Sequence, residues 1–566
     1  MSLFEQITHR RVPQTLVGYV VGLWGGAQVI SFVEERYALS PYWVELFVLG
    51  YLVLLPAVIA IAWNKGAPGP QPWSKVGLTA ISINVVVAIA VLAIGAQRLD
   101  LGPVTETVVV ENEEGETIER EVARAPFRKT LTLSFPLASA MDGPAREAAI
   151  DLEYLVESDL AQHPFVDLRS AWMENARAQR AGLDDATRMP RALVHEAARN
   201  HDADVFLAGR VEDAEVGHRF DLELVSTDDG RAIASESFAG VDLFTLADAI
   251  SVWVVESLDL PAVQFEDRPV ADLTTESPEA MRALAEGAVA LHLRADYEQA
   301  AADFARATEI DPTFALAHLA NYQANMLLGR MGVAVPAIDA AMQHAYRMSE
   351  RSQFLVRASY YGARNDAEKA LAVLEMWSTV HPNDPMALRL LTLNYGITRD
   401  VPRALESIER LLELTPDDVG TLETIYGVAM HQIDRPDMAI RAAEHWSELT
   451  PGEIAPWVAL ADAQQEAGNL AAASEAIERA LLVDPAAVDG RRIAAEIAMK
   501  QGDFDGAAAT YTELMDAARP DSDRFDAIGG LMILENRRGR IDRAVELLAE
   551  WEELGRRVAP PGQFAT

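Results

Sequence analysis

The residues best suited to hold a metal ion are His195, Glu196 and His201, which lie close together in the chain. A zinc site on one helix needs its two histidines on the same face, which a spacing of four residues provides. His195 and His201 are six residues apart, so on a helix they would point about 120° away from each other. Asp228-Asp229-Gly230 offers carboxylates that calcium prefers, but the same residues are typical of a solvated hairpin turn. We therefore predict no metal site.

Catalytic signatures are missing from the sequence. It contains no Gly-x-x-x-x-Gly-Lys phosphate loop, no Gly-x-Ser-x-Gly nucleophile elbow and no dinucleotide-binding glycine fingerprint. The chain has no cysteine, which excludes disulfides, thiolate zinc sites, iron–sulfur clusters and thiol nucleophiles. We predict that the protein is not an enzyme and binds no cofactor.

The charge of the chain is unevenly distributed. Residues 1–99 contain six basic and four acidic residues, which leaves 42 basic and 82 acidic residues, or a net charge of −40, in the rest of the chain. Such a surface repels phosphate backbones and anionic headgroups. We therefore expect no nucleic-acid partner.

Three apolar segments near the N-terminus are long enough to cross a membrane. They cover residues 12–33, 44–63 and 76–96. At 1.5 Å per residue, each can span a hydrocarbon core of roughly 30 Å. A cleaved signal peptide would explain only the first segment. We predict a membrane anchor over residues 1–99, in contact with the lipid bilayer through three spans.

The orientation of the anchor follows from the basic residues that flank the spans. On one side lie Arg10, Arg11, Lys65 and Lys75, and on the other lie Arg36 and Arg98. The positive-inside rule then places the N-terminus in the cytoplasm and the soluble domains outside, in the periplasm of a cell with two membranes.

Small and polar residues inside the spans predict helix packing. Gly18, Gly22 and Gly26 recur every four residues in the first span, which allows another helix to approach closely. That helix belongs either to the chain's own anchor or to an oligomer or membrane partner. Gln28 and Asn84 are not ionisable, so interhelical hydrogen bonds explain them better than a transport path does.

Residues 128–265 alternate between strand and helix patterns, after a polar stretch at 100–127 that we interpret as a tether or a hairpin. The predicted order is β-α-β-α-β-β-β-α, which indicates a small α/β domain whose sheet is partly antiparallel. The predicted strands cover 130–135, 165–168, 204–207, 219–225 and 231–238, and the predicted helices cover 145–162, 191–200 and 243–258.

Three sequence segments of this domain carry a resemblance to a known family. They are Asp202-Ala203-Asp204-Val205-Phe206-Leu207-Ala208-Gly209, the strand end Leu224-Val225-Ser226-Thr227-Asp228-Asp229-Gly230, and the helix start Asp242-Leu243-Phe244. The stretch resembles the TolB amino-terminal-like (FlgO-like) domain of bacterial envelope proteins. The resemblance implies a binding or assembly module, not an enzyme.

The second half of the chain repeats itself every 34 to 37 residues. An alanine recurs at positions 300, 334, 370, 404, 439, 473, 507 and 544, and a proline closes most repeats, at 312, 382, 416, 451, 485 and 520. Two amphipathic helices make one such unit, and stacked units bury a continuous core. Residues 266–556 resemble the tetratricopeptide-repeat (TPR) family, with about eight repeats, followed by a tail at 557–566.

The resemblance to TPR arrays implies a groove lined by the first helix of each pair. Counted from the repeating alanines, the groove positions include Met386, Arg389, Leu393, Thr424, Val428, Val458 and Asp462. This set is largely apolar and has no Lys/Asn pair, so we expect an apolar partner segment rather than a clamped C-terminal carboxylate.

The predicted fold class is therefore multidomain: an α-helical anchor of three spans, a small α/β domain at 128–265 and an all-α TPR superhelix. The predicted function is a non-enzymatic scaffold or accessory subunit of the bacterial inner membrane. It would recruit protein partners, including a membrane-embedded complex, at the periplasmic face, and homo-oligomerisation stays open. The alternative is an envelope signal-input component that acts through a separate effector. An enzyme of unrecognised type is a distant third.

Overall fold

The computed structural model describes residues 11–66, 73–138, 142–258, 260–261, 265, 267–517 and 521–558. Arg10, the centre of the predicted loop between the second and third spans, Pro520 and the tail from residue 559 lie outside the described residues. The chain divides into two compact units. Unit 1 comprises residues 1–171, 203–357 and 379–381, and unit 2 comprises residues 172–202, 358–378 and 382–566.

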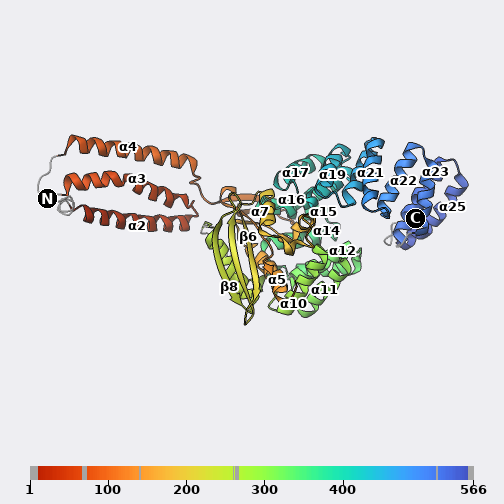
Figure 1. Cartoon of the computed structure of the whole chain (residues 1–566), viewed down its shortest axis with the longest axis horizontal. Coiled ribbons are helices and arrows are strands. Elements are labelled where there is room, and N and C mark those ends of the chain that lie inside the picture. Colours follow the sequence, from red (N-terminus) through yellow and green to blue (C-terminus); the bar gives the residue numbers. More distant parts are fainter. Residues whose placement is uncertain are drawn as a thin grey trace. The chain divides into compact units, whose positions relative to one another are not determined.

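Unit 1 begins with three apolar helices that pack side by side (Figure 1). They are α2 (Val12–Tyr37), α3 (Tyr42–Lys65) and α4 (Lys75–Arg98), and each is long and apolar enough to cross a membrane. Gly22 and Gly26 of α2 face α3, where a Cβ on Gly22 would lie 3.4 Å from the Tyr51 hydroxyl and one on Gly26 would clash with the Phe47 ring. Gly18 has open space around its Cα. Two of the three predicted packing glycines therefore serve contacts within this chain.

Asn84 of α4 makes hydrogen bonds to backbone groups of α3 that flank a proline. Pro56 lies inside α3 and has no backbone N–H, which disturbs the helical ladder around it. The Asn84 Nδ2 donates to the Val53 carbonyl at 2.9 Å, and its Oδ1 accepts from the Ala57 N–H at 3.2 Å. The predicted interhelical hydrogen bonding of Asn84 is thus confirmed.

A two-stranded antiparallel hairpin follows the apolar helices. It consists of β1 (Thr105–Glu111) and β2 (Thr117–Ala123). Its Arg120 pairs with Glu350, and its Glu113 accepts from the Arg357 Nε at 2.8 Å. The stretch predicted as a tether or a hairpin is therefore an ordered hairpin that contacts Glu350 and Arg357 of the same unit.

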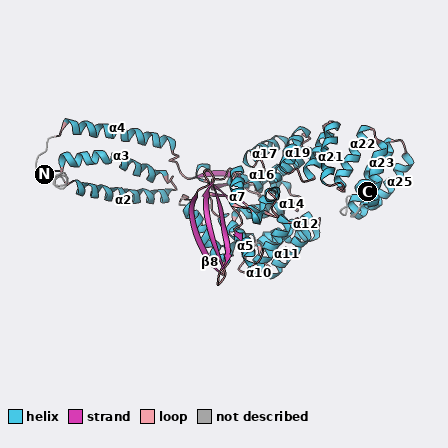
Figure 2. Ribbon diagram, in the orientation of Figure 1, coloured by secondary structure: helices cyan, strands magenta, loops and turns pink. Residues whose placement is uncertain are grey.

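A mixed sheet of six strands comes next, with the order β5-β3-β6-β7-β8 and β4 paired beside β6. The strands β5, β3 and β6 run parallel, and β6, β7 and β8 run antiparallel. Figure 2 shows the long antiparallel strands together. Their bounds are β3 (Lys129–Thr132), β4 (Leu137–Ala138), β5 (Val166–Arg169), β6 (Val205–Asp213), β7 (His218–Ser226) and β8 (Ala232–Gly240). The predicted α/β domain with an antiparallel part is confirmed in its elements.

Two helices of this domain pack together against the sheet, α5 (Pro144–Leu160) and α8 (Leu243–Ser257). Apolar side chains from both helices and from the strands form a buried cluster, which continues into the first helix pairs of the repeat array. The sheet and the start of the array therefore share one core within unit 1.

Within the described residues, the repeat array consists of eight helix pairs. The first pair follows the short helix α9 (Val270–Leu273), and a π-helical turn (Val289–Leu293) joins its two helices. The pairs are α10 (Pro278–Ala288) with α11 (Tyr297–Ile310), α12 (Ala315–Leu327) with α13 (Met331–Gln343), α14 (Glu350–Gly362) with α15 (Ala367–Val380), α16 (Pro385–Ile397) with α17 (Val401–Leu414), α18 (Val419–His431) with α19 (Pro436–Leu449), α20 (Ala455–Glu466) with α21 (Leu470–Val483), α22 (Val488–Gln501) with α23 (Phe504–Ala517), and α24 (Asp521–Arg537) with α25 (Ile541–Val558).

The repeating alanines lie where the helices of each pair cross. All eight are buried, with at most 8% of their surface exposed. Five residues before each alanine, the turn between the two helices contains one residue with positive φ, which is glycine in four pairs. In the other pairs it is Ala295, Asn365, Arg399 and Asp434, with φ between 52° and 57°. The burial of all eight alanines agrees with their predicted role in close helix packing.

One segment between β5 and β6 belongs to unit 2. Residues 172–202 include α6 (Asn175–Arg180) and α7 (Arg191–Asn200), and they cluster with the later repeats rather than with the sheet. The α/β domain predicted over residues 128–265 therefore contains a segment that groups with unit 2.

Candidate protein-binding groove

The first helices of successive pairs form a continuous row in unit 2. Helix α16 contacts α18, α20 contacts α22, and α22 contacts α24. Because side chains three or four residues apart share one side of a helix, each first helix adds a similar stripe to this row. We call the exposed and half-buried side of this row the groove.

The structure places most predicted groove residues at partly accessible positions. Met386, Arg389 and Leu393 on α16 are half-buried, as are Val458 and Asp462 on α20. Their side chains therefore remain available in part to a partner.

Val428 requires a correction, because it is fully buried in the structure. Its Cγ1 lies 3.1 Å from the position that a Cβ on Gly396 would take, so it packs between α18 and α16. Counting from the repeating alanine assigns residue 428 to the groove but does not predict its burial. Val428 is buried because Gly396 of α16 has no side chain and leaves a space that the valine fills.

Arg389 is engaged within its own chain. Its Nη1 lies 3.7 Å from the Asp418 carboxylate, and its guanidinium also lies beside Gly420 at the start of α18. A carboxylate clamp needs a cation that is free to meet the ligand. That this groove is no carboxylate clamp stays a prediction.

The groove becomes polar toward its C-terminal part. The Tyr426 hydroxyl donates to the Asp462 Oδ2 at 3.1 Å, and burial together with this carboxylate raises the pKa of Tyr426. One repeat further on, the Arg492 Nη1 donates to the Glu496 Oε1 at 2.7 Å. Burial raises the pKa of Asp526, although the nearby Arg492 partly opposes that rise.

These polar residues occupy equivalent positions in successive repeats. Adding 34 to the positions of Val458 and Asp462 gives Arg492 and Glu496, and a second step from Arg492 gives Asp526. The sequence prediction stopped at Asp462 and so described the groove as largely apolar. Continuing the same spacing would have found its charged end.

The segment 172–202 adds a cation near the array. Burial and the adjacent Arg177 lower the pKa of Arg180, while Glu453 and Asp417 of the array oppose that shift. Arg180 therefore lies within electrostatic range of two acidic residues that precede first helices of the array.

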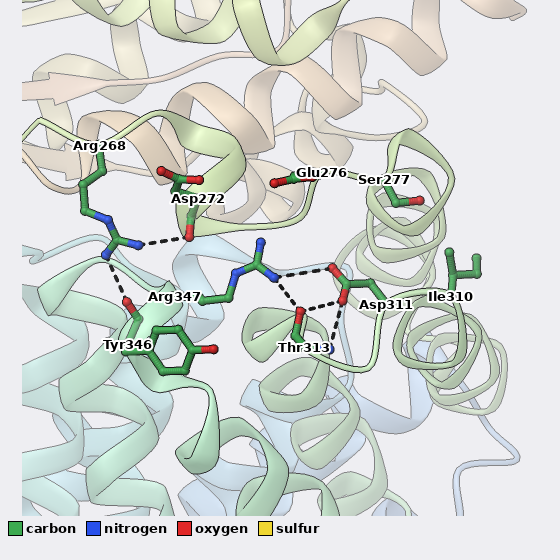
Figure 3. A pocket seen from close by; sticks show the side chains of 9 residues that line it. All are labelled: Arg268, Asp272, Glu276, Ser277, Ile310, Asp311, Thr313, Tyr346 and Arg347. Atoms are coloured by element: carbon green, nitrogen blue, oxygen red, sulfur yellow. Dashed lines mark hydrogen bonds and ion pairs between the residues drawn. The ribbon is translucent and has the colours of Figure 1, made fainter.

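Unit 1 contains an open polar cavity of about 680 Å³, which Figure 3 shows. Arg268 donates to the Tyr346 carbonyl at 3.0 Å, and Arg347 donates to the Ala271 carbonyl at 3.2 Å. Burial alone would raise the pKa of Asp311, but hydrogen bonds from Thr275 and Thr313 leave it lowered. These two arginines hold the segment before α10 against the first two helix pairs, so their role is structural.

A second cavity of unit 1, of about 560 Å³, lies between α5, the start of α8 and α10. Asp151 lines it with only 5% of its surface exposed, and its Oδ2 pairs with Arg282 at 2.8 Å. Burial raises the pKa of Asp151 to about 7, against the attraction of Arg282. The buried acid and its arginine link α5 to α10.

The residues considered for metal binding have other contacts. The His201 Nε2 lies 3.2 Å from the carboxylate of Glu174, which lies in a short helix earlier in the chain. In the part of the chain that the structure describes, no group of three or more His, Asp or Glu side chains is arranged to hold a metal ion.

Comparison with known proteins agrees with the repeat architecture. A family model described as tetratricopeptide repeat matches residues 454–486, which cover α20 and α21. No curated protein matches the chain.

Several solved structures are similar to the chain in fold. MamA from Desulfovibrio magneticus RS-1 shares 20% identity, with 29% of this chain and 93% of that chain covered and a TM-score of 0.27. A tetratricopeptide repeat protein from Parabacteroides merdae shares 15%, with 46% and 99% covered and a TM-score of 0.34. Human IFIT1 shares 15%, with 74% and 98% covered and a TM-score of 0.40. The repeat-model match and the helix pairs with buried alanines identify the second half of this chain as a TPR-type array.

Proposed function

We propose that this protein is a non-enzymatic scaffold, anchored in the bacterial inner membrane, which recruits a protein partner through its TPR array at the periplasmic face. The observation that carries the proposal is the groove of unit 2. Its half-buried apolar residues Leu393 and Val458 lie on the same row of helices as the charged pair Arg492 and Glu496. Such a surface suits a partner segment that is apolar at one end and polar at the other.

The anchor and the sheet domain support a location in the cell envelope. Three helices are long and apolar enough to cross a membrane, and the basic residues that flank them favour a cytoplasmic N-terminus. The resemblance of residues 128–265 to the TolB amino-terminal-like domain supports an assembly role. We propose that the domains end near residues 99, 127, 265 and 556, as the composition of the sequence indicates.

A double substitution in the groove tests partner recruitment. In the Leu393→Glu/Val458→Glu variant, both new carboxylates would have to be buried against an apolar partner, at a cost of several kcal/mol. We expect the stoichiometric partner that co-purifies from gently solubilised membranes to be lost. Far-ultraviolet circular dichroism should stay unchanged, because neither side chain is fully buried.

Leu482→Glu is the matched control. Leu482 lies on α21, the second helix of its pair, and 83% of its surface is exposed. The Leu482→Glu variant introduces the same kind of charge outside the groove and should leave the partner bound. Retention of the partner by the double variant would show that the groove is not the docking surface. Recovery of a kinase, cyclase or regulator in place of an envelope complex would favour the signal-input alternative.

A reporter fusion tests the orientation. A reporter that is active only in the periplasm should be active when it is fused after Thr566, because the flanking basic residues place the soluble domains outside. The same reporter inserted after Gly66, between the second and third apolar helices, should be inactive. The reverse pattern would overturn both the orientation and the periplasmic location.

A further inference from the structure

The cavity between α5, the start of α8 and α10 combines apolar walls with a buried acid. Its volume of about 560 Å³ lies within the range of about 300–1,000 Å³ in which proteins bind small molecules. Its apolar lining consists of Leu155, Val241, Leu243, Phe244, Pro278 and Met281. Leu155 and Met281 are buried, whereas Val241 is 68% exposed and so marks the side that opens to solvent. The cavity can therefore hold the apolar part of a small molecule.

One carboxylate oxygen of Asp151 is left for a donor in this cavity. The Asp151 Oδ2 lies 2.8 Å from the Arg282 Nη2. The Oδ1 is buried, and in the part of the chain that the structure describes it has no hydrogen-bond partner. A buried acceptor without a donor destabilises the folded state. Because Asp151 lines the cavity, a donor that enters the cavity can satisfy this oxygen.

The charges that line the cavity favour a cationic donor. Three of the lining residues are acidic, namely Asp151, Asp242 and Glu279, and one is basic, Arg282. Arg282 is also shared with Glu147, at 3.4 Å. A cation that enters the cavity therefore meets a net negative surface, which attracts it.

An anion is disfavoured, although two helices begin at the cavity. The Phe244 N–H at the start of α8 donates to the Asp242 Oδ1 at 3.1 Å. The Ala280 N–H at the start of α10 donates to the Ser277 Oγ at 3.2 Å. The chain's own side chains thus cap both helices and engage backbone donors that an anion would need. A divalent metal ion would be repelled by the Arg282 guanidinium.

We propose that this cavity binds a small organic cation with an apolar body, whose ammonium group donates to the Asp151 Oδ1 while Arg282 keeps its contact with the Oδ2. Leu243 and Phe244 contact the apolar part. The site is independent of partner recruitment by the groove, because its lining residues all belong to unit 1.

Binding of the cation is coupled to the ionisation of Asp151. Burial raises the pKa of Asp151 to about 7; Arg282 opposes the rise, and Glu147 and Glu286 add to it. A bound ammonium stabilises the charged carboxylate and so lowers its pKa. The cation should therefore bind up to about a hundredfold more weakly at pH 5 than at pH 8, where Asp151 is already ionised.

Calorimetric titration of the full chain in detergent micelles tests the site. The ligand is 2-phenylethylammonium, its neutral match is 2-phenylethanol, and its anionic counterpart is 3-phenylpropanoate; titration into micelles alone is the blank. At pH 8 we expect saturable binding of the ammonium, at least roughly tenfold tighter than that of either counterpart. Equal binding of the alcohol, tighter binding of the carboxylate or no binding of the ammonium would each overturn the proposal.

Two carboxyl-to-amide variants test the role of Asp151. Asp151→Asn should weaken binding of the ammonium at least roughly tenfold and remove its pH dependence. Glu256→Gln is the control, because Glu256 is exposed and lies at the other end of α8 from the cavity. It should change the affinity less than about twofold. Equal effects of the two variants would count against the assigned acceptor.

Val241 allows a test that leaves the buried acid in place. Because Val241 is exposed, Val241→Lys and Val241→Glu should both keep the fold. The lysine variant brings a second cation to the edge of the cavity and should bind 2-phenylethylammonium more weakly than the parent, whereas the glutamate variant should bind it more tightly. The same affinity in both variants would show that the ligand binds elsewhere.

Discussion

Replacing Arg128 with methionine is expected to destabilise unit 1 by about 3–5 kcal/mol, the usual cost of removing one partner of a buried ion pair. Only 3% of the Arg128 side chain is exposed, and its Nη1 lies 3.0 Å from the Asp167 Oδ1. Its other nitrogens donate to the carbonyls of Ala123 at 3.0 Å and Val380 at 2.7 Å. One guanidinium therefore ties the end of the hairpin, strand β5 and the end of α15 together.

Hydrogen exchange of the backbone amides of β3 and β5 measures this effect in the full chain, where a single unfolding transition is not expected. Lys129→Met is the control next in sequence: Lys129 pairs with Asp204 at 3.1 Å, but both side chains are about 40% exposed. An exposed pair contributes less than about 1 kcal/mol. The Arg128→Met/Asp167→Leu variant should recover part of the loss, since it removes both charges. Equal effects of the Arg128 and Lys129 variants would contradict the role given to burial.

The repeat architecture was predictable from sequence because its main requirement is steric. A helix crossing needs a small residue, and alanine fills that position in all eight pairs. The turn conformation was harder to predict. Arg399 and Asp434 adopt positive φ in turns where other repeats use glycine. A non-glycine residue pays a steric penalty there, so packing of the two flanking helices imposes a conformation that local preference opposes.

The assignment of residues 172–202 to unit 2 could not be predicted from the local sequence pattern. The helix predicted at 191–200 is present as α7, with the same bounds. Its assignment to unit 2 depends on contacts with residues more than 150 positions later in the chain. The opposite charges of Arg180 and of Glu453 and Asp417, which interact electrostatically, are the one hint in the sequence, but nothing in the spacing of these residues links them.

The exposure of the groove residues could not be predicted from the local sequence pattern either. Equivalent positions were found by counting, but burial depends on the size of the neighbour, as Gly396 beside Val428 demonstrates. Exposure of a repeat position therefore has to come from the structure, whereas its membership in the row can come from sequence.

The buried acid of α5 gives the second large effect. Asp151 has a pKa of about 7 in the folded chain, because burial opposes its charge more than Arg282 favours it. Between its ordinary value and about 7, the folded state holds a proton that the unfolded state has released. The stability of unit 1 should therefore fall as pH rises through this range and level off above it.

Asp151→Asn removes the titration and keeps the size of the side chain. At pH 8 we expect the variant to be more stable than the parent by up to about 4 kcal/mol, a value set by a shift of about three pKa units. At pH 4 the two should differ little, because the parent's carboxyl is then neutral in the folded state. Hydrogen exchange of the α5 and α10 amides at several pH values measures the difference.

Glu147→Gln is the control for Asp151→Asn, because it makes the same change on the same helix. Glu147 also pairs with Arg282, at 3.4 Å, but 60% of its side chain is exposed. Water screens such a group, so its amide variant should shift the stability little at either pH. If Asp151→Asn were less stable than the parent at pH 8, the ionised carboxylate would be needed to hold Arg282. The link between α5 and α10 would then be a stabilising ion pair rather than a strained one.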